Sequence, residues 1–269
     1  MTGEQGKLHT SDYLRAIGVP ELPALTSPFD PGYDPVTLES HLEQSSHLMA
    51  SLKISMACWL IADEGSTRRK FSAARQHGVM STTGGGPFEV AVQQGRLPEF
   101  LDLCADVGAV RVECGEGFTD LPLEPGEVAR LVEERGLQFQ FELGKKHGGA
   151  FTEGVVAELI DQGKEWLQAG ARELVVEARE SAQGVGTFDE HGNLNGAVAN
   201  RFAEAFGLDI VLFEAPNKSS QFQFMNHFGP LVRLCNVRLE ELLRVEIYRR
   251  GLHSDAFQHE NLRPPRPEG

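Results

Sequence analysis

Ala109-Val-Arg-Val-Glu113 is the first of four short apolar runs that end in glutamate and lead into a helix-like segment. The others are Leu137-Gln-Phe-Gln-Phe-Glu142, Glu173-Leu-Val-Val-Glu177 and Ile210-Val-Leu-Phe-Glu214, and Leu231-Val-Arg-Leu-Cys-Asn-Val237 closes the series. Strands that alternate with helices predict a parallel sheet. Buried strands with acidic and basic residues gathered at one end are typical of the mouth of a (β/α)8 barrel. The pattern therefore favours an enzyme.

Eight candidate strands are spread along the chain. They are Leu22–Pro28, Leu48–Ser55, Val79–Thr83, Ala109–Glu113, Gln138–Glu142, Leu174–Glu177, Ile210–Glu214 and Val232–Val237. Between them, segments such as Glu153 to Ala169 carry apolar residues on one helical face, and Gly170 is placed to end that helix. Eight strands and a length of 269 residues predict one α/β domain, a TIM-type (β/α)8 barrel, for which ~250 residues is typical.

The two ends of the chain differ in composition from the centre. We expect a flexible N-terminal segment over residues 1–12, the barrel over residues 13–258, and a flexible proline-rich tail over residues 259–269, where three prolines interrupt any helix.

Charge and cysteine content restrict the class of protein. A net charge of −14, from 39 acidic and 25 basic residues, argues against general affinity for nucleic acid or anionic membranes. No apolar run reaches the ~18 residues of a membrane span and no signal-peptide core is present, so we expect a soluble, cytoplasmic protein. The four cysteines form no C-x-x-C pair, which predicts free thiols rather than a zinc site.

Charged residues continue past three of the strand ends, in Glu142-Leu-Gly-Lys-Lys146, Glu177-Ala-Arg-Glu-Ser181 and Glu214-Ala-Pro-Asn-Lys218. One glutamate at a strand end serves stability as readily as catalysis, but four at equivalent ends are harder to explain by stability. At least one of Lys145 and Lys146 is expected to point across the mouth. Arg179 either forms a structural ion pair or clamps a carboxylate or phosphate. Thr82-Thr-Gly-Gly-Gly86 is read as a tight turn or as an anion site.

Longer motifs carry a family resemblance. They are Gly84-Gly-Gly-Pro-Phe-Glu89, Glu142-Leu-Gly-Lys-Lys146, Val176-Glu-Ala-Arg-Glu-Ser181, Phe213-Glu-Ala-Pro-Asn-Lys218, Phe228-Gly-Pro230 with Leu234-Cys-Asn236, and Arg249-Arg-Gly-Leu-His-Ser-Asp-Ala-Phe257. In this order they resemble the phosphosulfolactate synthase family, the barrel enzymes of coenzyme M biosynthesis with bacterial and plant relatives.

The resemblance implies an enzyme of the lyase type that adds sulfite to C3 of phosphoenolpyruvate with the help of Mg2+. It also implies a small anionic substrate and a homo-oligomer. Lys145 would be the leading acid or electrophile, with Lys146 as its alternate. The further catalytic residues would be Lys53 and Glu142. The metal ligands would be Glu142, Glu177 and Glu214. The substrate-binding residues would be Arg179, Lys218, Gly85, Gly86, Arg233, Asn236 and Gly229.

The first third of the chain departs from the family pattern. Asp30-Pro-Gly32 stands where the family has Asp-Lys-Gly, and Lys53-Ile-Ser-Met-Ala-Cys58 stands where it has Lys-Phe-Gly-Trp-Gly-Thr. A divergent enzyme with another nucleophile or acceptor is therefore an alternative, and a non-catalytic, stress-associated member is a third. Replacement of Pro31 by lysine and of Met56 by glycine would raise sulfite-dependent turnover only in the divergent enzyme.

Overall fold

The computed structural model describes residues 9–54, 56–121 and 124–263, and a closed barrel of eight parallel strands forms its centre. The strands are β1 (Thr26–Asp30), β2 (Leu52–Ile54), β3 (Ser81–Thr83), β4 (Arg111–Gly115), β5 (Gln138–Leu143), β6 (Leu174–Val176), β7 (Val211–Glu214) and β8 (Leu234–Arg238). Strand β1 pairs with β8, which closes the barrel. The predicted (β/α)8 fold is thus confirmed.

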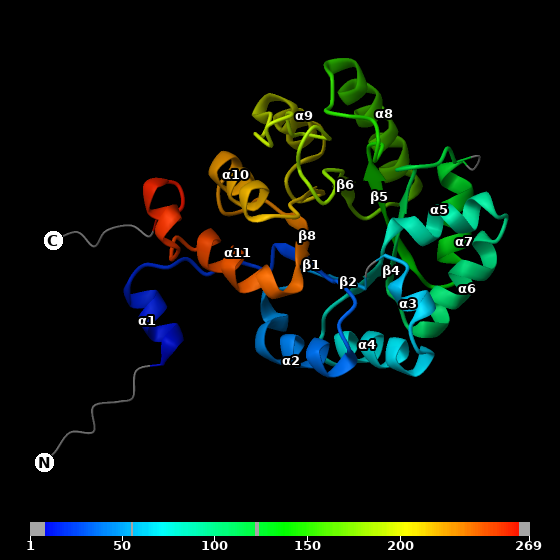
Figure 1. Ribbon diagram of the computed structural model, residues 1–269, viewed down its shortest axis with the longest axis horizontal. Helices are drawn as coiled ribbons and strands as arrows, with labels where there is room; N and C mark the ends of the chain where they lie inside the picture. The colour runs from blue at the N-terminus through cyan, green and yellow to red at the C-terminus, as the bar shows by residue number, and fades with distance from the viewer. Residues whose placement is uncertain (1–8, 55, 122–123, 264–269) are drawn as a thin grey trace, which may run out of the picture.

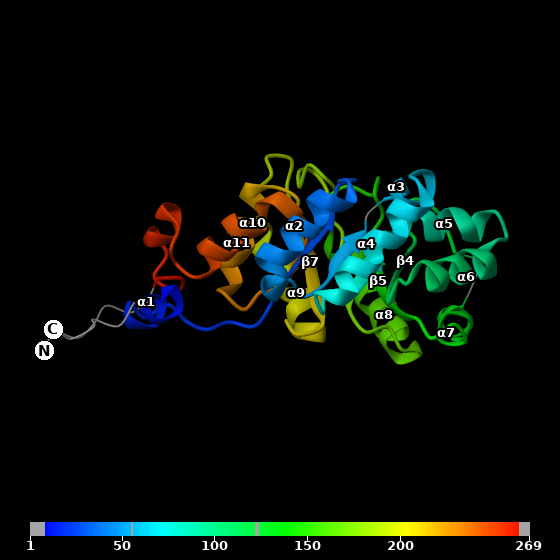
Figure 2. The ribbon, with the colours of Figure 1, turned by 90° about the horizontal axis from the view of Figure 1, so that it is seen from below.

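The helices surround the strands, apart from the N-terminal one, which lies to one side of the barrel (Figures 1 and 2). They are α1 (Thr10–Ala16), α2 (Pro35–Ser45), α3 (Cys58–Ile61), α4 (Glu64–Gln76), α5 (Gly85–Gln93), α6 (Leu97–Val107), α7 (Pro125–Glu133), α8 (Glu153–Ala169), α9 (Gly196–Phe206), α10 (Lys218–Phe228) and α11 (Leu242–Arg249). Short 3-10 turns cover Ser46–Leu48, Leu239–Glu241 and Ser254–Gln258. Among the described residues, no helix is both long and apolar enough to cross a bilayer.

Helix α8 shows how local sequence sets these elements. The Thr152 side chain caps its N-terminus by accepting from Val155 N, and Gly170 ends it with a φ of 115°, which favours glycine. Trp166 on its buried face stacks on Phe141 of β5, with ring centroids 4.0 Å apart. The helix therefore fixes β5, the strand that carries Glu142.

The structure corrects several expected boundaries. Strand β1 begins at Thr26 and not at Leu22, and β8 begins at Leu234 and not at Val232. Within the predicted N-terminal segment, α1 begins at Thr10. Within the predicted tail, Leu262 packs in the hydrophobic core. Residues 1–8 and 264–269 lie outside the described residues.

Inside the barrel, a small apolar cluster separates the polar side chains at the two ends of the strands. Leu174, Val176 and Phe213 belong to the large core between strands and helices, whereas Val175, Leu212 and Cys235 form a small separate cluster. Because strand residues alternate in direction, this small cluster lies inside the barrel. Polar side chains gather above it, at the carboxyl ends of the strands, and below it. All four cysteines are free, as predicted.

Candidate active site

Three carboxylates converge at the carboxyl ends of neighbouring strands. Glu142 is the last residue but one of β5, Glu177 directly follows β6, and Glu214 ends β7. All three side chains are buried, and each offers an oxygen within 4.8 Å of the oxygens of the others. Since parallel strands end at the same edge, the regular spacing of glutamates in the sequence becomes one cluster in space.

Lys146 reaches into this cluster from the loop after β5. Its Nζ lies 2.7 Å from Glu142 Oε1 and 2.6 Å from Glu177 Oε2. The turn that brings it there needs glycine at position 144. Gly144 has a φ of 117°, and a Cβ added to it would lie 2.7 Å from the Phe151 ring.

Burial shifts the protonation of the cluster. The pKa of Glu142 lies well above its ordinary value because burial disfavours the charged form and Glu177 adds negative charge. Burial and Glu214 raise the pKa of Glu177, and burial and Glu142 raise that of Glu214. Burial alone would lower the pKa of Lys146, but the three carboxylates outweigh it and raise this pKa. Lys146 is therefore an ammonium at neutral pH, and one positive charge faces three acidic groups.

Lys53 forms a second charged pair beside the cluster. Its Nζ lies 2.7 Å from Glu113 Oε2 and 2.7 Å from Asn236 Oδ1, and both members of the ion pair are buried. The amide of Asn236 donates to Glu214, and the backbone N–H of Gly85 donates to Glu113 at 3.1 Å. Lys53, Asn236 and Gly85 thus lie in one hydrogen-bonded network with the carboxylates.

Backbone amides hold two of the carboxylates in place. Ala178 N donates to Glu214 Oε2 at 2.9 Å, and Arg179 N donates to Glu177 Oε1 at 2.5 Å. Arg179 adopts a backbone φ of 54°, which residues other than glycine seldom do. This local strain aims the amide at the cluster and the side chain toward the loop that holds Lys146.

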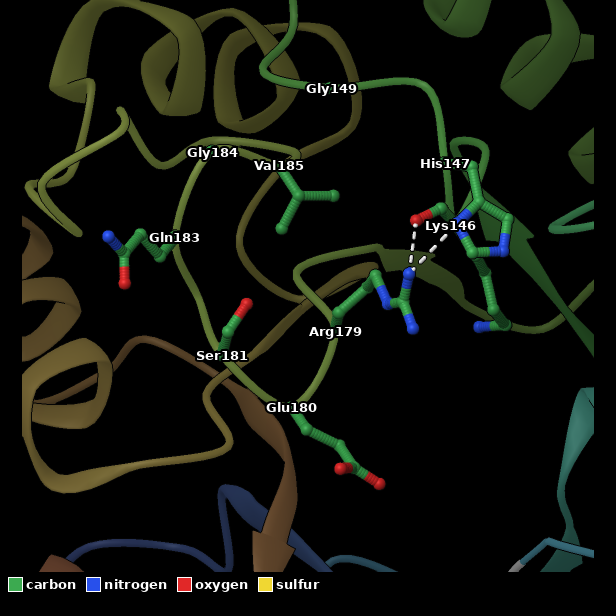
Figure 3. Close-up of a pocket in the computed structure, with 9 residues that line it drawn as sticks. All are labelled: Lys146, His147, Gly149, Arg179, Glu180, Ser181, Gln183, Gly184 and Val185. Atoms are coloured by element: carbon green, nitrogen blue, oxygen red, sulfur yellow. Dashed lines mark hydrogen bonds between the residues drawn. The ribbon is translucent and has the colours of Figure 1, made fainter.

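The Arg179 side chain borders a cavity of about 450 Å³ (Figure 3). Its Nη1 lies 3.0 Å from the Lys146 carbonyl oxygen and 3.0 Å from His147 Nδ1. The cavity is lined by Lys146, His147, Gly149, Arg179, Glu180, Ser181, Gln183, Gly184 and Val185. Cationic side chains therefore meet an open space at the edge of the carboxylate cluster.

Lys145 occupies a different place from the one expected. Its Nζ bonds to the Thr119 carbonyl oxygen at 2.8 Å and to Asp120 Oδ1 at 2.9 Å, and 45% of the side chain is exposed. It borders a second cavity, of about 500 Å³, with Phe118. Lys146, and not Lys145, lies at the centre of the site, because neighbouring residues of this loop point in different directions.

Arg233 and Gly229, which were predicted to bind substrate, lie at the opposite end of the barrel from the carboxylate cluster. Both precede β8 and therefore sit where the parallel strands begin. Arg233 binds the carboxylate of Glu173 and the carbonyl oxygen of Asp209. Glu173 also pairs with Arg111, so these charges close the bottom of the barrel.

The remaining predicted residues lie at the mouth but outside the cluster. Lys218 begins α10, pairs with Asp255 at 3.0 Å and is half-exposed. Gly86 lies in the first turn of α5, where an added Cβ would be 3.9 Å from the ring of Phe118. Their surroundings therefore differ from those of the three carboxylates.

The sequence interpretation missed three residues of the site. Glu113 ends the first of the four apolar runs, so the pattern that revealed the other glutamates marked it as well. Glu89 accepts hydrogen bonds from the backbone N–H groups of Gly117, Phe118 and Thr119, and its place in the glycine-rich motif was a weaker signal. His147 had no sequence signal beyond its position after Lys146.

Comparison with known proteins gives the family of the chain. The family model described as (2R)-phospho-3-sulfolactate synthase (ComA) matches residues 20–255. Phosphosulfolactate synthase of Methanocaldococcus jannaschii is 30% identical over 234 residues, which cover 87% of this chain and 93% of the relative. That of Methanothermobacter thermautotrophicus is 29% identical over 248 residues, covering 91% and 95%.

Solved structures share the barrel. KGPDC from Streptococcus mutans superposes with a TM-score of 0.54 at 12% identity, covering 88% of this chain and 98% of that one. Deoxyribose phosphate aldolase from Aeropyrum pernix gives 0.53 at 14% identity, covering 90% and 98%. At such identities the likeness shows the fold alone. The match of the family model over most of the sequence shows more, and this chain belongs to the phosphosulfolactate synthase family.

Proposed function

We propose that this protein catalyses the addition of sulfite to C3 of phosphoenolpyruvate, with Mg2+ as cofactor, to give phosphosulfolactate. The observation that carries the proposal is the cluster of Glu142, Glu177 and Glu214 with Lys146 among them at the carboxyl end of the barrel. Family membership supports the same kind of enzyme.

The carboxylate cluster fits a hard divalent cation. Mg2+ prefers oxygen ligands, and the three glutamates offer carboxylate oxygens close to one another. Burial and mutual repulsion raise the pKa of each carboxyl group, so bound positive charge would be favourable there. Glu142, Glu177 and Glu214 would hold the ion, which when bound supplies positive charge near the substrate carboxylate.

The reaction places specific demands on the remaining residues. A carbon–sulfur bond forms between sulfite and C3, and the electron pair of the C2–C3 double bond moves toward the carboxylate. A proton must then reach C2, while the phosphate ester stays intact. Charge develops on the carboxylate, so cationic groups that are held in place before the reaction stabilise the transition state.

The cationic side chains meet these demands in different ways. Lys146 is the ammonium at the centre of the cluster and is the group that we assign to proton delivery at C2. Lys53 is locked by Glu113 and Asn236, which suits it to bind a substrate anion without moving. Arg179 faces the adjoining cavity, where its planar guanidinium would bind a phosphate or carboxylate.

A thermal-shift screen with Mg2+ and phosphoenolpyruvate tests this function. We expect the two together to raise the melting temperature more than either alone, because ligands that bind the folded state stabilise it. No shift with any combination would count against the proposal. Glu214→Gln removes one of the three carboxylates and should reduce this shift, whereas Glu165→Gln on the exposed face of α8 is the control and should keep it.

A second candidate is the same chemistry with a different acceptor or nucleophile. Met56 favours it, because this residue at the mouth adopts a φ of 51° and leaves 49% of its side chain exposed. An exposed apolar side chain there would suit a substrate with an apolar substituent. If Pro31→Lys with Met56→Gly raises sulfite-dependent turnover, this candidate is supported. Unchanged turnover would show that Pro31 and Met56 do not determine whether sulfite is used.

A further inference from the structure

The position of Lys146 conflicts with a cation at the same carboxylates. Its Nζ makes short contacts to Glu142 and Glu177, at 2.7 and 2.6 Å. These are two of the three groups whose oxygens converge within 4.8 Å. A divalent ion bound by those oxygens would stand close to the ammonium, and two like charges at such a separation repel each other strongly in a buried site.

We propose that Lys146 is a displaceable counter-ion: a divalent cation replaces its ammonium at Glu142 and Glu177, and the freed side chain turns into the cavity beside Arg179. This inference rests on the proposed function, since it takes the carboxylate cluster as the cation site. It adds a step in which cation binding releases the lysine toward the substrate.

The surroundings of Lys146 allow the side chain to move while its backbone stays fixed. The backbone N–H donates to the Gly117 carbonyl oxygen at 2.6 Å, and the backbone carbonyl accepts from Arg179 at 3.0 Å. The side chain is 29% exposed and lines the cavity of about 450 Å³ (Figure 3). Rotation about side-chain bonds is therefore enough to carry the ammonium from the cluster into open space.

The exchange also improves the charge balance of the site. One ammonium faces three carboxylates before the exchange, whereas a divalent cation brings two positive charges to the same oxygens. The released ammonium then joins Arg179 at the cavity and makes it more attractive to an anion. Cation and anionic substrate should consequently strengthen each other's binding, and such coupling is reciprocal.

Mg2+ affinity tests the exchange directly. Calorimetric titration with Mg2+ alone measures the affinity of three proteins for the ion. These proteins are the wild type, Lys146→Met and Lys145→Met. We expect Lys146→Met to bind Mg2+ on the order of tenfold more tightly, because a competing charge a few ångströms away is gone. Lys145→Met should match wild type, since Lys145 binds Asp120 outside the cluster. Unchanged or weaker Mg2+ binding by Lys146→Met would overturn the inference.

Lysine acylation in wild type gives a second readout that needs no variant. Mass spectrometry after brief treatment with an acylating reagent measures how reactive each lysine is. Mg2+ should increase the labelling of Lys146 and leave that of Lys145 unchanged. Equal labelling of Lys146 with and without Mg2+, under conditions where calorimetry shows saturation, would contradict displacement.

Mg2+ binding by the two proteins separates the cation site from the displacement of Lys146. If neither wild type nor Lys146→Met binds Mg2+, the cation site of the proposed function is wrong and the exchange falls with it. If both bind Mg2+ equally well, the cation site stands and only the displacement of Lys146 is wrong.

Discussion

At the scale of single residues, the site depends on buried charges that neutralise each other. Lys53 and Glu113 are both buried, and each would leave the other uncompensated if it were removed. Removal of one partner of a buried pair typically costs about 3–5 kcal/mol of stability. The same geometry keeps Lys53 in position for an anion, so stability and function share this contact.

A double-mutant cycle separates the two roles of Lys53. Lys53→Met should lower the free energy of unfolding by about 3 kcal/mol and reduce turnover at least about a hundredfold. Lys53→Met with Glu113→Gln should regain much of the stability, because no unpaired charge is left, without regaining turnover. Chemical denaturation and steady-state kinetics measure both. Full activity in the double variant would show that Lys53 is structural only.

The raised pKa values of the carboxylates predict how stability depends on pH without Mg2+. A carboxyl group whose folded pKa is raised stabilises the fold below its ordinary value of 4.5, and this contribution is lost as pH rises through the folded pKa. The contribution of Lys146 to stability does not change in this pH range, because its pKa is raised from an ordinary value of 10.5 and it stays protonated. The stabilising contribution of these three carboxyl groups should thus fall above pH 4.5, and Glu214→Gln should remove part of that fall. Denaturation at several pH values measures it, and identical slopes for both proteins would contradict the assignment.

At the scale of elements, the loop after β5 decides which lysine enters the site. Gly144 makes the turn, with a φ of 117° and no room for a Cβ beside Phe151. Which of two successive loop residues faces the cluster depends on a few backbone dihedrals, and the sequence does not encode these in any visible pattern. The sequence predicted that at least one of the two lysines points across the mouth and preferred Lys145 as the acid, whereas in the structure Lys146 reaches the carboxylates and Lys145 bonds to Asp120.

A glycine substitution tests the turn. Gly144→Ala should lower the free energy of unfolding by more than about 1 kcal/mol, because alanine at this φ is strained and its Cβ meets Phe151. Gly126→Ala in α7 is the control, since a Cβ there meets nothing within 4 Å, and it should be neutral or slightly stabilising. Equal melting temperatures for the two variants would show that the turn does not require glycine.

At the scale of the whole molecule, the sequence predicts the barrel better than it predicts the site. Alternation of buried runs with amphipathic helices follows from burial, so it is visible in the sequence and was confirmed. The glutamates of the cluster could be predicted because a charge at the end of a buried run is unusual. Arg233 and Gly229 were assigned to the wrong end because residues before and after a strand look alike without its boundaries.

The central claim is that the carboxylate cluster and Lys146 support sulfite addition to phosphoenolpyruvate. Phosphorus NMR of purified protein with phosphoenolpyruvate, sulfite and Mg2+ tests it most directly, with Glu214→Gln as the comparison. We predict that the phosphoenolpyruvate signal is replaced by that of a new phosphate ester, identified by mass as phosphosulfolactate, and that the variant loses this activity. An unchanged phosphoenolpyruvate signal with folded wild-type protein, or equal turnover by Glu214→Gln, would contradict the account.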